Sequence, residues 1–346
     1  MRHIVILTNS LSGGGAEASA LILQKEFTAR GLDVTLIGIN ADNPFNIPTT
    51  TKIFSLNRDK SKPIRSTIVT LFNFRIFINS QKIDTLIVNC ELPELFCLIL
   101  PRQIHLVIVE HANPTWFQRE RLGRFIRRNL RKRKPTLVTV GGHLQPRFFE
   151  DLEYVHVPNP IEEIDPREMV ITKSEITRLV YLGRLSATFK NPLTALRVAE
   201  QTNYPLIMIG DGDMLQSLKS YATKHKIDCV FTGFQVNPWR LIRSGDLLLI
   251  PSSAEGDGLT LIEAIQRRVP FLASDIPDLN RYGILKSNYC SSFEEFVNRV
   301  NLYCHSLDAL VVPQSTAIRI LESRKPNEVV KKWIKVLFNP NTQSLI

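Results

Sequence analysis

Short apolar runs that read as buried strands alternate with helix-like segments along almost the whole chain, and this alternation restricts the possible folds more than any other feature. Strands that alternate with helices form parallel sheets with helices on both faces. The alternation starts again in the second half. It therefore predicts an α/β protein with two doubly wound, Rossmann-like domains that face a central cleft. The candidate strands are His3–Thr8, Val34–Ile39, Ile83–Asn89, Ile104–Glu110, Thr136–Val140, Arg178–Leu182, Leu206–Ile209, Cys229–Thr232, Leu247–Ile250 and Pro270–Ala273.

The length and the linker-like segments favour two domains. A chain of 346 residues exceeds the size at which single cores stop growing. The segment EYVHVPNPIEEIDP, with its prolines and acids, has the character of a domain end followed by a linker. We expect an N-terminal domain over residues 1–160, a C-terminal domain over 161–325, and a last helix with a tail over 326–346. Residues 40–82 show no clear pattern: a Pro/Thr/Asn-rich stretch leads through basic residues into an aromatic-bearing helix candidate.

The composition and the cysteine usage indicate the cellular compartment. With 44% hydrophobic and 22% charged residues, it is ordinary for a soluble globular protein. Five cysteines without a C-x-x-C pair argue against a disulfide framework and a zinc site, and fit a reducing compartment. The N-terminal run HIVILT is too short for the core of a signal peptide, and no apolar run approaches the roughly 18 residues of a membrane helix. A cytoplasmic protein is expected.

The stretch PSSAEGDGLTLIEA, residues 251–264, follows a buried strand and leads through a glycine-containing turn into a helix. Gly256 and Gly258 permit backbone geometry closed to other residues and let a ligand approach the chain closely. The first helical amides, near Gly258, Leu259 and Thr260, have no partner inside the helix and carry the positive end of its dipole. The stretch therefore predicts a site for an anion such as a phosphate.

Two carboxylates bracket this stretch. Glu255 lies on the turn, and Glu263 lies just over one helical turn into the helix. Backbone amides donate hydrogen bonds to a phosphate, and carboxylates accept them from hydroxyls, so the combination points to a phosphorylated sugar. An ordinary strand–loop–helix unit with two surface glutamates is the alternative that the stretch alone leaves open.

A glycine loop follows the first candidate strand. Gly13, Gly15 and Ala18 match the loose dinucleotide-binding pattern, but the nearest acid to the end of the second strand that would hold a ribose is Asp42. We interpret the loop as a backbone surface for a phosphate or a sugar, with a tight turn of small residues as the alternative. His111 lies just past a strand, at the edge where open α/β sheets bind ligands, although a lone His there is more often structural.

A basic segment dominates the charge of the first half. Residues 1–160 hold 21 Lys/Arg and 13 Asp/Glu, and residues 119–134 alone hold nine basic residues and one acid, Glu120. Apolar residues recur there at helical spacing, which predicts an amphipathic helix with a cationic face suited to anionic lipid or a polyanion. A merely solvated charged face is the alternative. The apolar residues are Leu122, Phe125, Ile126 and Leu130, and the cationic ones are Arg121, Arg124, Arg127, Arg128 and Arg131.

The second half contains the motifs GRLSATFKN, IGDGD, FTGF and PSSAEGDGLTLIEA, in that order. With them the chain resembles the retaining glycosyltransferases of family 4, which have the GT-B fold. The N-terminal GGGAE loop, the VPNPI segment and the closing helix also fall where that family has them, so the resemblance covers almost the whole chain. In the family the closing helix packs back on the first domain.

The resemblance implies a donor site for a nucleotide sugar. Arg184 and Lys190 would hold the diphosphate, Glu263 the ribose hydroxyls, and Glu255 the transferred sugar. The GGGAE amides would close over the phosphates, and His111 matches the family's His near the sugar. The implied catalytic residues are His111, Arg184, Lys190 and Glu255. The implied donor-binding residues are Gly14, Gly15, Arg184, Lys190, Gly210, Gly233, Phe234, Glu255, Gly256, Gly258, Leu259, Thr260 and Glu263.

The resemblance also implies the reaction. A hexose or N-acetylhexosamine would move, with retention, from a nucleoside diphosphate sugar (UDP favoured) to a lipid-linked or cell-surface glycan. Arg, Lys and a helix N-terminus can stabilise the diphosphate leaving group without a metal ion, so neither a metal nor a cofactor is expected. Asp211-Gly212-Asp213 imitates a D-x-D metal motif, but the family carries a glycine turn there near the nucleotide base. No enzymic base or nucleophile is assigned.

The first domain binds the acceptor in this fold, so the basic helix predicts a peripheral protein at an anionic membrane surface with a lipid-linked or glycolipid acceptor. Two departures leave the donor open: Asp257 stands where the family often has an aromatic, and SDIPDL replaces a common glycine pair. Other readings are a sugar-nucleotide epimerase of the same fold, an NAD-dependent oxidoreductase, and a non-enzymatic polyanion-binding protein. Nucleic acid is not an expected partner, because few aromatics accompany the basic residues.

Overall fold

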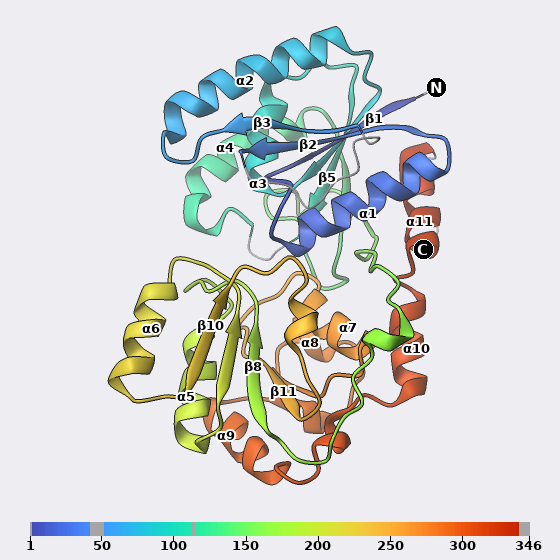
Figure 1. The fold of residues 1–346 in the computed structure, drawn as a ribbon. Coiled ribbons are helices and arrows are strands. Elements are labelled where there is room, and N and C mark those ends of the chain that lie inside the picture. The colour runs from blue at the N-terminus through green and yellow to red at the C-terminus, as the bar shows by residue number, and fades with distance from the viewer. Residues whose placement is uncertain (1, 42–51, 112–114, 339–346) are drawn as a thin grey trace. The chain divides into compact units, whose positions relative to one another are not determined.

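The chain divides into two compact units, and each is a parallel β-sheet covered by helices (Figure 1). The first unit holds Met1–Glu162 together with Ser323–Ile346, and the second holds Glu163–Glu322. The tail predicted after the last helix, residues 339–346, lies outside the described residues. The residues that this computed structural model describes are 2–41, 52–111 and 115–338.

The first sheet is fully parallel, with the strand order β3-β2-β1-β4-β5-β6-β7. The direction in which strands are added reverses between β1 and β4. Open α/β sheets bind ligands at such a switch point, outside the carboxyl ends of the strands. The strands are β1 (His3–Thr8), β2 (Asp33–Asn40), β3 (Ile53–Arg58), β4 (Thr85–Asn89), β5 (His105–Glu110), β6 (Thr136–Thr139) and β7 (Tyr154–His156).

Helices cover both faces of this sheet, because successive strand residues point to opposite sides. Ile4 and Ile6 of β1 pack with α1 and α11, and the alternate residues Val5 and Leu7 pack in the core shared by α2, α3 and α4. The last helix, α11, lies against α1 and belongs with it to the first unit, as the resemblance implies. The helices are α1 (Gly15–Ala29), α2 (Pro63–Ser80), α3 (Glu91–Phe96), α4 (Glu120–Arg131) and α11 (Pro326–Phe338).

The second sheet repeats the design, with the order β10-β9-β8-β11-β12-β13 and a switch point between β8 and β11. Helices α5, α6 and α9 share a core with one of its faces. The two sheets confirm the predicted pair of doubly wound α/β domains. The strands are β8 (Arg178–Leu182), β9 (Leu206–Ile209), β10 (Cys229–Gly233), β11 (Asp246–Ile250), β12 (Phe271–Ser274) and β13 (Tyr289–Cys290). The helices are α5 (Pro192–Thr202), α6 (Leu215–Lys224), α7 (Leu259–Gln266), α8 (Pro277–Asn280), α9 (Phe293–Leu302) and α10 (Gln314–Glu322).

Local structure departs from the sequence-based expectation in a few places. The alternation of strands and helices predicts a helix near His143–Glu150, and this prediction is wrong: the segment forms turns, and Phe148 adopts a left-handed conformation with φ 66° beyond Pro146. Strands β3, β7 and β13 were not anticipated, because each is short or carries a mixed polar and apolar sequence. Among the described residues, no helix combines the length and apolar character needed to cross a bilayer.

Candidate functional site

Two loops meet at the switch point of the second sheet, one after β8 and one after β11. The Lys190 ammonium lies 2.7 Å from Glu255 Oε1, and the Ser252 hydroxyl donates to the same carboxylate oxygen at 2.7 Å. The Asn191 side-chain amide donates to the Pro251 carbonyl, which ties the loops together a second time. Two residues predicted to act on a donor, 65 positions apart, therefore form one ion pair.

Arg184 follows β8 in the same loop, and its side chain is exposed. The Tyr181 hydroxyl fixes this loop by donating to the Arg184 carbonyl at 3.0 Å and the Lys190 carbonyl at 3.4 Å. Burial raises the pKa of Tyr181, so the phenol stays protonated as a donor. Within the described residues, no hydrogen bond or ion pair joins the Arg184 guanidinium to another predicted site residue. The loop thus carries one paired and one solvent-facing cation.

Two of the predicted donor-binding glycines, Gly210 and Gly233, lie at the carboxyl ends of β9 and β10. A Cβ at Gly210 would lie only 1.9 Å from the Gly183 carbonyl oxygen, and Gly210 has φ 141°, a conformation that favours glycine. The Gly210 amide donates to the Gly233 carbonyl at 3.0 Å. Phe234 follows directly and is 51% exposed, which leaves its ring on the surface beside these strand ends. Close backbone packing therefore explains Gly210, whereas Gly233 is explained by its φ of 70°, since a Cβ there would meet nothing within 4 Å.

Helix α7 begins at the predicted anion site. Gly258 is its N-cap with φ 64°, and its carbonyl accepts the first helical hydrogen bonds, from the Leu261 and Ile262 amides. The amides of Leu259 and Thr260 precede these bonds and carry the positive helix end. The Glu255 amide, by contrast, donates to Asp278 Oδ2 of α8 at 2.6 Å. The amides that the predicted anion site could use are therefore those at the start of α7 rather than every amide in the turn.

The two departures from the family pattern hold this turn in place. Asp257 is 4% exposed and forms an ion pair with Arg281 at 2.7 Å. The Tyr282 hydroxyl donates to the Asp257 carbonyl at 2.6 Å. Asp278, in the SDIPDL segment, accepts the Glu255 amide. Both acids therefore connect the β11–α7 turn to residues 278–282, where the sequence alone left their role open.

Glu263 has a set of contacts of its own. The Trp239 indole N–H donates to Glu263 Oε2 at 2.8 Å, and the Arg267 guanidinium stacks on the Trp239 ring with 4.9 Å to its centre. Burial raises the pKa of Glu263, while the Trp239 hydrogen bond and the Arg267 charge oppose that rise. Sequence reasoning missed Trp239, which lies 24 residues before the carboxylate it contacts.

The first unit carries the other predicted residues at its own switch point. Asn89 ends β4; its side-chain amide donates to the Ala16 carbonyl at 2.9 Å, and its Oδ1 lies 2.6 Å from His111 Nε2. Since the amide nitrogen serves Ala16, Oδ1 is the acceptor and His111 Nε2 holds the proton. Sequence reasoning missed Asn89, although its place at a strand end beside β1 was a usable signal.

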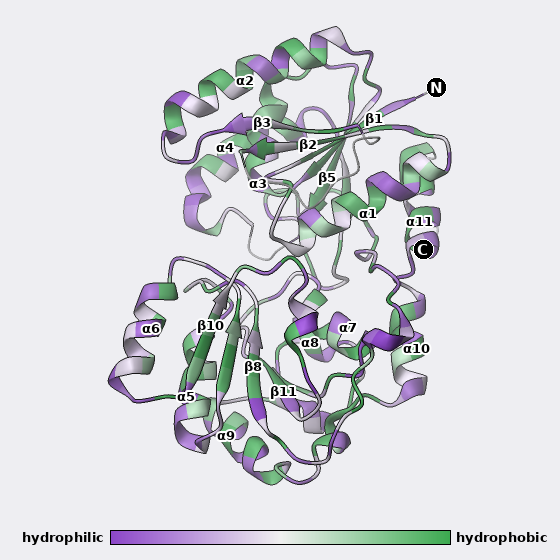
Figure 2. Cartoon of the chain, in the orientation of Figure 1, coloured by the Kyte–Doolittle hydropathy of each residue, from purple (hydrophilic) through white to green (hydrophobic). Residues whose placement is uncertain are grey.

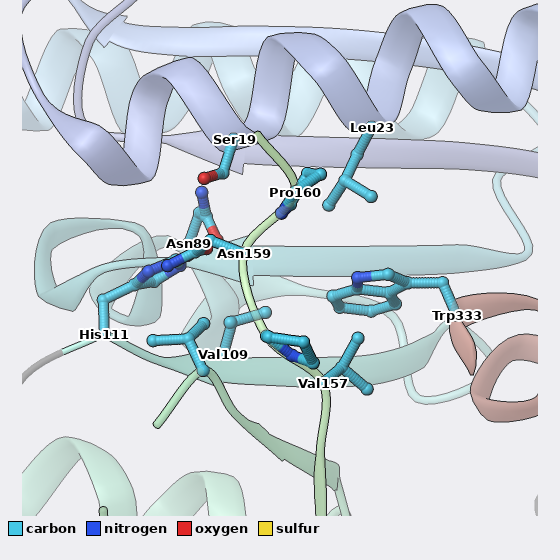
Figure 3. A pocket seen from close by; sticks show the side chains of 11 residues that line it. Ser19, Leu23, Asn89, Val109, His111, Val157, Asn159, Pro160 and Trp333 are labelled. Atoms are coloured by element: carbon cyan, nitrogen blue, oxygen red, sulfur yellow. The ribbon is translucent and has the colours of Figure 1, made fainter. Parts of the chain in front are cut away.

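A cavity of about 10 Å³, room for one water molecule, lies between these side chains (Figure 3). Ser19, Asn89, His111 and Trp333 line it. The glycine loop runs alongside, and Gly14 is the N-cap of α1, which begins at Gly15. A Cβ at position 14 would lie 2.1 Å from the carboxylate of buried Glu17. That carboxylate would lie beside any phosphate on this loop, so it weighs equally against a dinucleotide pyrophosphate and against the donor diphosphate that the resemblance places at Gly14 and Gly15.

The first correction to the predicted basic helix is that Arg127 is not part of a cationic surface. It is completely buried in α4, where it lies 2.5 Å from Glu94 and 2.9 Å from Glu110 and donates to the Arg147 carbonyl. Burial raises the pKa of Glu110 to about 7, and nearby Arg127 counteracts that rise. The helix turns position 127 inward beside Ile126, so its single positive charge lies between two buried carboxyl groups.

The remaining α4 arginines behave as predicted, but the apolar stripe does not. Arg121, Arg124, Arg128 and Arg131 are exposed. Ile126 and Leu130 are buried as expected. The expectation for the other two apolar residues is wrong, because Leu122 is 39% and Phe125 61% exposed. A helix packed on a sheet buries only one stripe, and here the buried stripe includes Gly123 and Arg127.

The D-x-D-like segment offers no cluster of ligands. The Asp211 carboxylate accepts the neighbouring Gly212 amide at 2.7 Å, a local turn contact. A Cβ at Gly212 would lie 2.2 Å from the Leu185 carbonyl oxygen, so this glycine turn packs against the loop after β8. Over residues 2–41, 52–111 and 115–338, no group of three or more His, Cys, Asp or Glu is placed to hold a metal ion.

The second-unit site lies inside a recognisable domain. Residues 166–287 match the protein family described as glycosyl transferases group 1. This range includes Arg184, Lys190, Glu255 and Glu263, of which the structure joins Lys190 to Glu255. Residues 166–287 therefore form a glycosyltransferase domain, which confirms the predicted enzyme class.

Two curated relatives are similar to parts of the chain. The lipopolysaccharide 1,6-galactosyltransferase of Escherichia coli K12 is 30% identical over 127 residues, which cover 34% of this chain and 35% of that protein. The chain thus matches about a third of that relative's length. The GalNAc-alpha-(1->4)-GalNAc-alpha-(1->3)-diNAcBac-PP-undecaprenol alpha-1,4-N-acetyl-D-galactosaminyltransferase of Campylobacter jejuni is 23% identical over 288 residues, 79% of each chain.

A solved structure shares the fold. HepE of Anabaena, in complex with UDP and glucose, superposes with a TM-score of 0.72 at 14% identity, covering 97% of this chain and 99% of that one. At this identity the likeness concerns the fold alone. Together with the two switch-point sheets and α11 on the first unit, it confirms the predicted GT-B fold.

Proposed function

We propose that this chain is a retaining, metal-independent glycosyltransferase of family 4. Its donor would be a nucleoside diphosphate sugar carrying a hexose or N-acetylhexosamine. The observation that carries the proposal is the Lys190–Glu255 ion pair at the switch point between β8 and β11. Arg184 lies in the same loop after β8 as Lys190, and the N-terminus of α7 follows β11 and the turn that carries Glu255. Cations and free amides suit a diphosphate, and a carboxylate suits sugar hydroxyls.

The ion pair also suggests how the donor is received. A diphosphate competes for the Lys190 ammonium, since it offers more negative charge than one carboxylate. Release of Lys190 leaves Glu255, which Ser252 still holds, to accept hydrogen bonds from the sugar. As the anomeric carbon–oxygen bond breaks, its electron pair passes to the diphosphate oxygen, where Arg184, Lys190 and the α7 amides stabilise the charge. The acceptor hydroxyl attacks the same face and gives its proton to that phosphate oxygen.

The proposed donor nucleotide is UDP, and the proposed acceptor is a lipid-linked or cell-surface glycan. Support for UDP comes from HepE, whose structure holds UDP and glucose in the same fold. Support for the acceptor comes from the relatives, one named for lipopolysaccharide and the other for an undecaprenol diphosphate glycan. A thermal-shift panel of UDP-, GDP- and ADP-sugars tests the proposal: a UDP-sugar at 100 times its dissociation constant adds about 2.7 kcal/mol to the free energy of unfolding. No stabilisation by any of them would contradict it.

The two glutamates are expected to divide their roles. Glu263→Gln should weaken the binding of bare UDP about tenfold, because a neutral amide accepts a ribose hydrogen bond less strongly than a carboxylate. The Gln carbonyl oxygen can still accept from Trp239, so the fold should persist. Glu255→Gln should leave bare UDP affinity unchanged or raised, because Lys190 is released, but it should impair sugar transfer. Calorimetric titration with UDP, paired with a transfer assay, separates the two, and equal losses of UDP affinity would contradict this division.

We further propose that the exposed arginines of α4 hold the protein at an anionic membrane surface on the cytoplasmic side. Replacing Arg121, Arg124, Arg128 and Arg131 by Gln should lower affinity for anionic vesicles at least about tenfold, since each basic residue near such a surface contributes roughly 1 kcal/mol. The variant spares buried Arg127, and the exposed pairs it removes contribute little to stability. Vesicle sedimentation measures the loss. A control variant with Lys219, Lys224, Lys226 and Arg240 replaced by Gln should bind the vesicles as the parent protein does. An equal loss of vesicle affinity in the control variant would mean that overall positive charge, and not α4, is responsible for binding.

A further inference from the structure

Helix α2 has two apolar faces, and only one of them is covered. Thr70, Phe74 and Ile78 recur every four residues and are buried against the first sheet. A second apolar set recurs at the same spacing on the opposite side of the helix and is exposed. Its members are Ile64 (77% exposed), Ile68 (64%), Val69 (53%), Phe72 (66%) and Ile76 (53%). We call these five residues the α2 outer face.

Monomeric proteins seldom leave such a continuous apolar stripe in water. Figure 2 shows hydrophobic segments along the length of α2. Residues 60–82 contain five Lys/Arg and no Asp/Glu. Arg65 lies within the outer face by its helical angle, and Lys60, Lys62 and Lys82 flank the helix as exposed residues. The surface is therefore apolar at its centre and mainly cationic around it, with one acid, exposed Asp59, beside the first turn of α2.

We propose that the α2 outer face inserts into the interfacial region of an anionic lipid bilayer. Helices with an apolar face and a basic rim lie in the plane of such an interface, with the apolar side chains below the headgroups. The charge argues against a second copy of this chain as the occupant. A twofold interface through α2 would place the same Lys and Arg side chains against each other.

Helix α4 lies on the same side of the first sheet, because Ile126 and Leu130 share the core that buries Phe74 and Ile78. Phe117 and Phe125 in and beside α4 are 59% and 61% exposed, among its arginines. The inference extends the membrane part of the proposed function, and adds an apolar anchor to the electrostatic attraction assigned to α4. It is argued independently of the donor site, because no residue of the α2 outer face is among the residues assigned to the donor.

The test is sedimentation of the full chain with phosphatidylcholine vesicles, with and without phosphatidylglycerol, at low and physiological salt. Ile68→Ser/Phe72→Ser/Ile76→Ser should lower affinity for the anionic vesicles at least about tenfold at physiological salt, where the Debye length is about 8 Å and apolar burial must hold the protein. A matched control, Val230→Ser/Val236→Ser/Ile318→Ser, removes side chains of similar exposure (57, 69 and 55%) from the second unit and should bind as the parent protein does.

A second measurement reports insertion directly. Phe72→Trp should be quenched by brominated lipid in anionic vesicles, beyond the signal of the native tryptophans, whereas Ile318→Trp should not. Equal vesicle binding by the α2 triple variant and the parent would overturn the inference, as would equal binding to vesicles without phosphatidylglycerol. If the parent protein is a dimer and the triple variant is a monomer that binds vesicles equally well, the α2 outer face is instead an interface with a second copy of this chain.

The vesicle-binding and thermal-shift measurements also distinguish a failure of this inference from a failure of the proposed function. Loss of binding in the α2 variant but not in the α4 arginine variant would support the apolar anchor and reject the role proposed for α4. Persistent stabilisation of the α2 variant by a UDP-sugar would show that its donor site is intact. Absence of that stabilisation in the parent protein would reject the proposed donor while leaving the vesicle result valid.

Discussion

Replacing Arg184 or Lys190 by Ala is expected to lower turnover by about 10²–10³, the loss typical of removing one charge-stabilising donor from an active site. Both side chains come from the loop after β8, at the kind of switch point where open α/β sheets bind ligands. In the proposed reaction the diphosphate gains charge as the glycosidic bond breaks, so the missing cation raises the barrier more than it weakens donor binding. Initial rates at saturating UDP-sugar measure the effect.

The two variants should differ in stability, which provides an internal check. Arg184 is exposed, so its removal should leave the melting temperature unchanged. Removal of Lys190 leaves the Glu255 carboxylate, 9% exposed, without its cation, and a modest fall in melting temperature is expected. Glu255→Gln combined with Lys190→Ala should reverse that fall without restoring turnover. Lys219→Ala, an exposed cation on α6, is the control that should keep full turnover. Near-parental turnover in either site variant would remove that residue from the mechanism.

Arg127→Ala is expected to lower the free energy of unfolding by about 3–5 kcal/mol, the loss typical of breaking a buried ion pair from one side. Without the guanidinium, the carboxylates of Glu94 and Glu110 remain buried with no cation between them. Arg128→Ala, at the next position of the same helix but exposed, should change the free energy by less than about 0.5 kcal/mol. Denaturant unfolding of the three proteins measures the difference, and matching values for both variants would contradict the buried network.

The loss should depend on pH, because the pKa of Glu110 in the folded protein, about 7, lies above its ordinary value of 4.5. A carboxyl group with a raised folded pKa binds more protons in the folded state between these two values. Its contribution to stability is full below pH 4.5 and is lost as the pH rises through 7. Removing the Arg127 charge should raise this pKa further, so Arg127→Ala should be least stable at pH 8 and partly recover at pH 5. A pH-independent deficit would exclude titration of Glu110.

Many structural features of this protein could be predicted from the sequence, because each depends on residues that are close together along the chain. Buried strands such as β1 and β11 are continuous apolar runs, and their length and Val/Ile/Leu content suffice to predict them. The glycine turn into α7 was predictable for the same reason, since a glycine turn and a helix start are properties of a few neighbouring residues. The exposed arginines of α4 were also visible as a local excess of charge.

Only the tertiary structure decided which charges meet. Lys190 and Glu255 pair because β8 and β11 are neighbours in the sheet, although two other strands separate them along the chain. Arg127 looked like its neighbours on α4, yet it alone reaches Glu94 and Glu110 on other elements. Helical periodicity states which residues share a face, but not which face meets the sheet. Strand order and helix docking settle that choice, and they depend on contacts between residues far apart in sequence.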